Sequence, residues 1–123
     1  MENFNQYPII SLEDGLKRVA NKKPLFARVL GTFTANTREN ELFDAIDGKD
    51  LAAAVMVTHT IKGVAANLSL IRLQKYTEEL ETQFKNAKES GDTGIFDAVD
   101  KAVGSKIFKD TLEEVTKIIP TLH

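Results

Sequence analysis

The sequence predicts an all-α fold, an antiparallel four-helix bundle with one or two additional N-terminal helices. Apolar residues recur at steps of three and four along several segments, which is the spacing of an amphipathic helix. Short polar or turn-forming stretches separate these segments, and short connections favour antiparallel neighbours. Strand patterns are nearly absent, because even the Asp47-Gly48 step is followed by helix formers and not by alternating residues.

The N-terminal part of the chain begins with two predicted helices. Ser11 and Asp14 have the spacing of a capping box, so the first helix is expected from Leu12 to about Ala20. Pro24 suits the first turn of the second helix. The apolar stripe of this second helix consists of Leu25, Phe26, Val29, Leu30 and Phe33.

Two further helices are expected before Ser69, which forms a turn. The first of these helices carries the apolar residues Leu42, Phe43 and Ile46. Gly48 is expected to end it, and Asp50 to cap the next helix, which covers about residues 51–68.

The remainder of the sequence predicts one helical segment before and one after a loop at residues 89–92. The first segment has its apolar residues at Leu73, Tyr76, Leu80, Phe84 and Ala87. The second has them at Phe96, Val99, Val103, Phe108, Leu112, Val115 and Ile119. Gly104 and Ser105 interrupt the second segment and are expected to kink or divide its helix, and Pro120 lies just past its end.

The composition is that of one soluble domain over residues 1–123. Hydrophobic residues make up 42% and charged residues 28% of the chain, which is enough to bury a core. A formal charge of −2 does not suggest a nucleic-acid partner, and the absence of cysteine excludes disulfides and thiolate chemistry. Two histidines far apart do not form a zinc pattern, so no metal site is expected. There is neither a secretory signal at the N-terminus nor an apolar run long enough for a membrane span, which favours a cytoplasmic protein.

His59 is predicted to lie on the solvent face of the helix over residues 51–68. Successive helix residues rotate by about 100°, which places the large apolar residues of this helix within roughly 40° of the side opposite His59. These expected core residues are Val57, Ile61, Val64 and Leu68. The side near His59 holds Ala52, Val55, Met56, Lys62, Gly63 and Ala66. A lone histidine is usually an ordinary core or surface residue, and this spacing excludes the core.

Two neighbours of His59 favour a phosphoryl acceptor over an ordinary surface histidine. Neutral imidazole is nucleophilic near neutral pH and needs no base if one nitrogen has a free lone pair. Lys62, one turn along the helix, can offset the negative charge of a phosphoryl group. Gly63 costs the helix about 1 kcal/mol relative to alanine, and it leaves space for an incoming partner. The other histidine, His123, is terminal and is expected to be disordered.

Residues 58–63, Thr-His-Thr-Ile-Lys-Gly, and the later pair Leu80-Glu81 match a known motif in order and spacing. Together they resemble the core of histidine-containing phosphotransfer (HPt) domains of bacterial phosphorelays. The resemblance covers about residues 10–87. It departs at Ser69, where the family's turn usually has glycine, and we interpret Ser69 as a modified turn.

The resemblance implies that His59 accepts a phosphoryl group from a phospho-aspartate on a receiver domain and passes it to another receiver's aspartate. It also implies that the chain has no kinase activity of its own and no cofactor, since the receiver binds the Mg²⁺. The implied partners are response-regulator receiver domains and a hybrid sensor histidine kinase. Glu81 would orient Lys62 or His59, or would be a surface charge, and Lys85 would add positive charge or be a solvated lysine. The docking surface expected around His59 is Ala52, Val55, Met56 and Ala66.

A helical adaptor is the alternative function that stays open. It would bind a receiver or a kinase through the same face without carrying phosphate. An inactive site of this kind would be expected to lack His59 or Lys62, and the sequence has both. A small helical enzyme lacks support, because the sequence has no carboxylate pair, metal cluster or Gly-rich phosphate loop. Met1 favours a free-standing protein, and the resemblance favours a monomer. The sequence names neither the upstream kinase nor the downstream regulator.

Overall fold

The computed structural model describes residues 3–122, and all of their regular secondary structure is helical, which confirms the all-α class. Residues 1, 2 and 123 lie outside the described residues, and with them the prediction made for His123. The elements are η1 (Phe4–Gln6), α1 (Leu12–Arg18), α2 (Lys23–Ala35), α3 (Glu39–Asp47), α4 (Leu51–Asn67), α5 (Ile71–Ser90), α6 (Ile95–Ala98), α7 (Lys101–Ile118) and η2 (Ile119–Leu122). Among these described helices, none has both the length and the apolar character that crossing a membrane requires.

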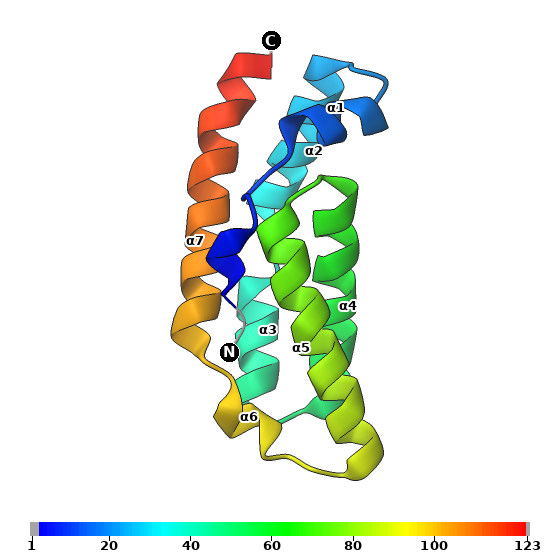
Figure 1. The fold of residues 1–123 in the computed structure, drawn as a ribbon, viewed down its shortest axis with the longest axis vertical. Coiled ribbons are helices and arrows are strands. Elements are labelled where there is room, and N and C mark those ends of the chain that lie inside the picture. The colour runs from blue at the N-terminus through cyan, green and yellow to red at the C-terminus, as the bar shows by residue number, and fades with distance from the viewer. Residues whose placement is uncertain (1–2, 123) are drawn as a thin grey trace.

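The helices form an antiparallel bundle of four columns (Figure 1). α2 and α3 stand end to end as one column, and α4, α5 and α7 are the other three. The first column is broken at residues 36–38, where Arg38 has a left-handed backbone with a φ of 66°. α1 lies across the end of the bundle as an additional N-terminal helix, as the sequence predicts.

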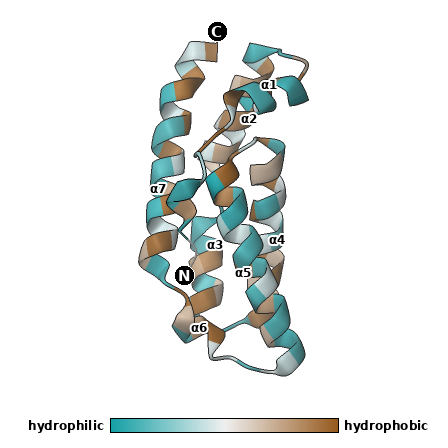
Figure 2. Cartoon of the chain, viewed as in Figure 1, coloured by the Kyte–Doolittle hydropathy of each residue, from teal (hydrophilic) through white to brown (hydrophobic). Residues whose placement is uncertain are grey.

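The core lies between the four columns and receives large side chains from each of them. The apolar faces turn inward and the polar faces outward along most helices (Figure 2). The largest fully buried apolar side chains include Phe26, Leu30, Leu42, Ile61, Leu73, Phe84 and Phe108. Each such side chain contributes roughly 1.5–3 kcal/mol when it is removed from water, so this apolar packing is the main force that holds α4 and α5 in place.

The predicted caps of the first helices are present. The Ser11 side chain accepts a hydrogen bond from the backbone N–H of Asp14 at 3.4 Å, and Asp50 accepts one from Ala53 at 3.0 Å. α1 ends at Arg18, slightly before the expected end, because Ala20 and the residue after it have positive φ values. The cap at Asp50 fixes the start of α4, the helix that carries His59.

The expected division of the C-terminal helix at Gly104 and Ser105 is wrong. α7 continues through both residues, and the break falls at Val99, before Asp100 caps α7. Gly104 is present for packing: a Cβ atom at this position would collide with the hydroxyl of Tyr76, and Phe43 also lies close to it. The glycine therefore allows α7 to approach its neighbours closely, and it does not end a helix.

The turn between α4 and α5 is tied to the N-terminal segment. Ser69 has a φ of 56°, a backbone that glycine adopts more easily, and its hydroxyl donates to the Asp14 carboxylate at 2.5 Å. The N–H of Ser11 donates to the carbonyl of Ser69 at 2.9 Å, and the N–H of Arg72 donates to the carbonyl of Pro8 at 3.0 Å. The hydrogen bond from Ser69, followed by that from Arg18, holds the pKa of Asp14 below its usual range. These bonds fasten the N-terminal segment to the turn and to the first residues of α5.

Candidate functional site

His59 stands on the outer face of α4, as the sequence predicts, with 68% of its side chain exposed. Three of the four expected core residues are buried on the opposite side, namely Val57, Ile61 and Leu68. The fourth, Val64, is 38% exposed, so its assignment to the core is wrong. Val64 lines a hollow of about 670 Å³ where α4 passes α1 and α2, and the neighbouring helices leave it partly uncovered there.

The surroundings of His59 on α4 are small or flexible side chains. Met56 is 71% exposed, Ala52 and Gly63 are also exposed, and Val55 and Ala66 are half-buried. A Cβ atom built on Gly63 would meet no atom within 4 Å, leaving aside the backbone of its own helix turns. Packing within this chain therefore does not require glycine at position 63, in contrast to position 104.

Glu81 of α5 lies beneath His59 and is buried, with only 3% of its side chain exposed. One carboxylate oxygen, Oε2, lies 2.9 Å from Nδ1 of His59 and 3.1 Å from Nζ of Lys85. The other oxygen, Oε1, lies 2.5 Å from Nζ of Lys62. The interpretation of Glu81 as a surface charge is therefore wrong, and the cluster joins His59, Lys62, Glu81 and Lys85 across two helices.

The three partners of Glu81 favour its ionised form. Burial alone would raise its pKa, because a low-dielectric surrounding disfavours the charged form. Hydrogen bonds from Lys62, Lys85 and His59 outweigh burial and lower the pKa of Glu81 to about 2. A buried carboxylate with three donors is well partnered, and the two lysines more than offset its charge.

The carboxylate also determines which nitrogen of His59 carries the proton. An ionised carboxylate can only accept hydrogen bonds, so we assign a proton to Nδ1, which donates to Glu81. In neutral imidazole this assignment leaves the lone pair on Nε2. Since most of the ring is exposed, Nε2 is the atom that is available to a reagent from outside.

The two lysines occupy different positions in the cluster. Lys62 is 30% exposed and bonds to Glu81, whereas the sequence led us to expect it to face whatever the imidazole carries. Lys85 is 56% exposed and also contacts Glu81, so it is not merely a solvated lysine.

The sequence did not predict the burial of Glu81, because this burial depends on the packing of α4 against α5. Its signal in the sequence is the row Leu73, Thr77 and Glu81, which runs along α5 at steps of four beside the apolar row.

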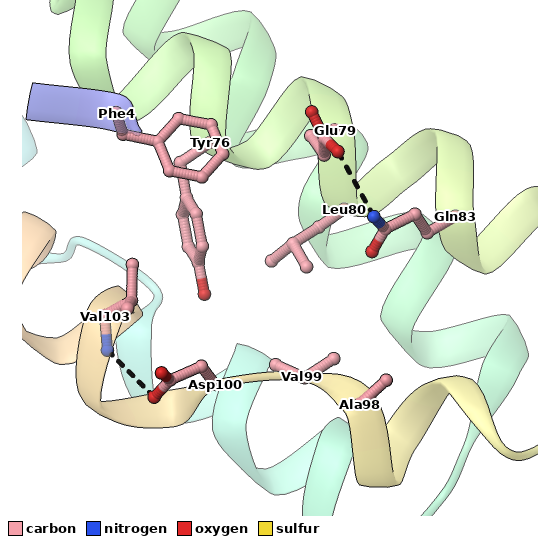
Figure 3. A pocket seen from close by; sticks show the side chains of 9 residues that line it. All are labelled: Phe4, Tyr76, Glu79, Leu80, Gln83, Ala98, Val99, Asp100 and Val103. Carbon is pink, nitrogen blue, oxygen red and sulfur yellow. Dashed lines mark hydrogen bonds between the residues drawn. The ribbon is translucent and has the colours of Figure 1, made fainter. Parts of the chain in front are cut away.

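A cavity of about 240 Å³ lies between α5 and the segment that joins α6 to α7 (Figure 3). Its lining includes Tyr76, Gln83 and Phe4. At about 100° per residue, Tyr76 and Gln83 lie about 140–160° around α5 from Glu81, so the cavity is on another side of the helix. The Tyr76 hydroxyl is buried without a hydrogen-bond partner among the described residues. Burial, and then the charge of Asp100, raise the pKa of Tyr76 above its usual range, so the Tyr76 phenol stays protonated. Within residues 3–122 we find no cluster of His, Cys, Asp or Glu that could hold a metal ion.

Comparison with known proteins identifies one family. A family model described as Hpt domain matches residues 30–117, which is more than half of the chain and includes α3 to α7 with His59 and Glu81. The match begins later and ends later than residues 10–87, over which we noted the motif resemblance. Neither a curated protein nor a solved structure matches the chain significantly.

Proposed function

The chain belongs to the Hpt domain family, whose members take part in histidine phosphotransfer in two-component phosphorelays, and from this premise we propose that His59 is the residue that carries the phosphoryl group. Hpt domains interact with receiver domains and histidine kinases. We propose that this chain accepts its phosphoryl group from a receiver phospho-aspartate and passes it to the aspartate of another receiver.

The observation that carries this proposal is the exposed imidazole whose Nδ1 is held by a buried anion. With Nδ1 bonded to Glu81, the lone pair of Nε2 is directed away from the helix pair. In the transfer, Nε2 forms a bond to phosphorus while the bond from phosphorus to the aspartyl oxygen breaks, and the receiver regains a carboxylate. No side chain of this chain has to remove a proton, because the attacking nitrogen already has its lone pair.

The charges around His59 suit a bound phosphoryl group. The group brings negative charge and three acceptor oxygens. Lys62 and Lys85 both contact Glu81, the carboxylate that also contacts the ring, and either could turn from Glu81 to a phosphoryl oxygen. Phosphoryl transfer depends mainly on positioning and charge stabilisation, and we propose that the receiver supplies the Mg²⁺ while this chain acts without kinase activity.

The surface around His59 suits a docking protein. We propose that a receiver covers Ala52, Val55, Met56 and Ala66, with Gly63 leaving its approach open. A hollow of about 570 Å³ between α3 and α4 extends this surface past Met56 and Thr60. Exposed methionine adapts to different partners, which suits a protein that meets more than one receiver.

Labelling of the chain by a charged receiver tests the proposal. A receiver domain loaded with radiolabelled acetyl phosphate should transfer label to the wild-type chain, and the label should be acid-labile and stable in alkali. His59→Gln should take up no label and should keep its helical circular dichroism, because His59 is exposed. His123→Gln, which changes the other of the two histidines, is the matched control and should be labelled normally. Receiver binding without any label on His59 would support the adaptor function instead.

A further inference from the structure

Met56 is the most exposed large apolar side chain among the described residues, with 71% of it open to solvent. It lies on α4 one turn before His59, about 60° around the helix and about 4.5 Å along it. The sequence has two methionines and no cysteine, so Met56 carries the one sulfur atom of residues 3–122. Oxidation of an exposed thioether to the sulfoxide is a common and enzymatically reversible reaction of methionine. The face that carries His59 therefore contains a single site for oxidation at sulfur.

We propose that Met56 is a redox modification site, and that its sulfoxide weakens the docking of a receiver on the face that carries His59. This inference rests on the proposed function, because it concerns the same docking surface. The oxidant is a peroxide, in the simplest case hydrogen peroxide. Its oxygen–oxygen bond breaks, one oxygen atom binds to an electron pair of the thioether sulfur, and the other oxygen leaves as water. A thiol-dependent reductase reverses the change: a dithiol becomes a disulfide, and the sulfoxide oxygen leaves as water.

The reaction makes the docking surface more polar and leaves the core untouched. A thioether is apolar, whereas a sulfoxide is polar and chiral. The rest of the proposed docking surface consists of small apolar side chains, Ala52, Val55 and Ala66. A receiver that covers this surface removes the sulfoxide oxygen from water, and a polar group buried without a partner opposes binding. The fold is spared, since Met56 belongs neither to the core nor to the side chains packed against it.

The polar groups that line the hollow beside Met56 suit a thioether better than a sulfoxide. Ionised carboxylates only accept hydrogen bonds, and three of them line this hollow: Glu41, Asp44 and Asp50. The Arg38 side chain, which also lines it, is paired with Glu41. The hydroxyl of Thr60 donates to the backbone carbonyl of Met56 itself. The sulfoxide oxygen, which is an acceptor, therefore depends on the receiver for a donor.

The test uses the full chain, a charged receiver and hydrogen peroxide. Wild-type protein is treated with peroxide, and peptide mass spectrometry measures the oxygen gained at Met56. Transfer from the charged receiver to His59 is then followed as a function of receiver concentration. The KM for the receiver should rise about tenfold in the oxidised protein while kcat stays unchanged, because a docking contact is lost and the chemistry is not. Treatment with methionine sulfoxide reductase should restore the original KM.

Two controls separate docking from damage elsewhere. Phosphoramidate, a small phosphoryl donor that needs no docking surface, should load His59 at the same rate in the oxidised and the untreated protein. Met56→Leu keeps an apolar side chain of similar size but has no sulfur at this position, so peroxide should leave the KM of this variant at its own untreated value. Met1, the other methionine, is still present in Met56→Leu and reports on oxidation away from α4.

Equal KM values for the oxidised and the untreated wild type would overturn the proposal, and so would a failure of peroxide to oxidise Met56. A rise of the same size in peroxide-treated Met56→Leu, or slower loading of the oxidised wild type by phosphoramidate, would overturn it as well, because the damage would then lie at another residue. If the receiver does not label His59 even in the untreated wild type, the proposed function fails by itself. Calorimetric binding of the receiver to the oxidised and the untreated chain would then decide whether the sulfoxide weakens docking.

Discussion

On each of two sides, α5 buries a polar side chain and faces a helix that contains a glycine. The two sides differ in how the polar group is partnered and how the glycine is packed. On the His59 side, α5 buries Glu81 with three hydrogen-bond donors, and the facing helix α4 has Gly63 open to solvent. On the other side, α5 buries Tyr76 with an unpartnered hydroxyl, and the facing helix α7 has Gly104 packed against it. In this chain, the partnered carboxylate and the free glycine lie at the proposed site, whereas the unpartnered hydroxyl and the packed glycine lie away from it.

The largest effect is expected when the Glu81 cluster is broken by acid. The folded-state pKa of Glu81 is lowered from an ordinary value of 4.5 to about 2, so its contribution to stability is present above 4.5 and is lost as the pH falls toward 2. The loss is on the order of 3 kcal/mol. Denaturant unfolding of the wild type and Glu81→Gln across this range measures it. The two proteins should converge in acid, and a constant difference between them would show that the partners of Glu81 do not lower its pKa.

Gly104→Ala should destabilise the protein. The added Cβ meets the Tyr76 hydroxyl and lies close to Phe43, and overpacking of this kind costs about 1–3 kcal/mol. In a Tyr76→Phe background the hydroxyl is gone, so the same substitution should cost less. Melting temperatures of the two single variants and the double variant give the coupling. Additive effects would mean that the contact between Tyr76 and Gly104 does not limit the packing.

Gly63 should behave in the opposite way. Gly63→Ala should stabilise the protein by up to about 1 kcal/mol, because the position is helical and a Cβ there meets nothing. Gly31→Ala in α2 is the matched control, since a Cβ at Gly31 also meets nothing and should stabilise similarly. Gly63→Gln should fold and yet slow transfer from a charged receiver. Transfer at the wild-type rate in both Gly63 variants would refute the idea that Gly63 clears an approach, and loss of stability in both would show that it is structural.

Tyr76→Phe should have the smallest effect, within about 1 kcal/mol and in the stabilising direction. Its hydroxyl is buried without a hydrogen-bond partner, so removing the hydroxyl breaks no hydrogen bond and relieves the cost of burying it. The ring contact with Phe4, with centroids 5.4 Å apart, stays in place. Thermal unfolding measures the change. A clear loss of stability would mean that the hydroxyl is bonded in solution, for example to a water molecule.

The sequence predicts well what depends on one helix at a time. Three of the four residues of the stripe on α4 and the cap at Asp50 follow from spacing alone, and with them the exposure of His59. The sequence fails where a residue's environment is made by another helix. The role of Gly104 depends on Tyr76 of α5, and the burial of Glu81 depends on α4 lying across it. Helical periodicity describes a face, but it does not say which neighbour covers that face.

The most direct test of the account is to determine which nitrogen of His59 carries the phosphoryl group. NMR of nitrogen-15-labelled protein, loaded by a charged receiver, distinguishes the two ring nitrogens by their chemical shifts and by coupling to phosphorus. We expect phosphorus on Nε2, with the proton of Nδ1 still donated to Glu81. Phosphorus on Nδ1, or on a residue other than His59, would contradict the account, because the hydrogen bond to Glu81 would then not determine where this protein carries its phosphoryl group.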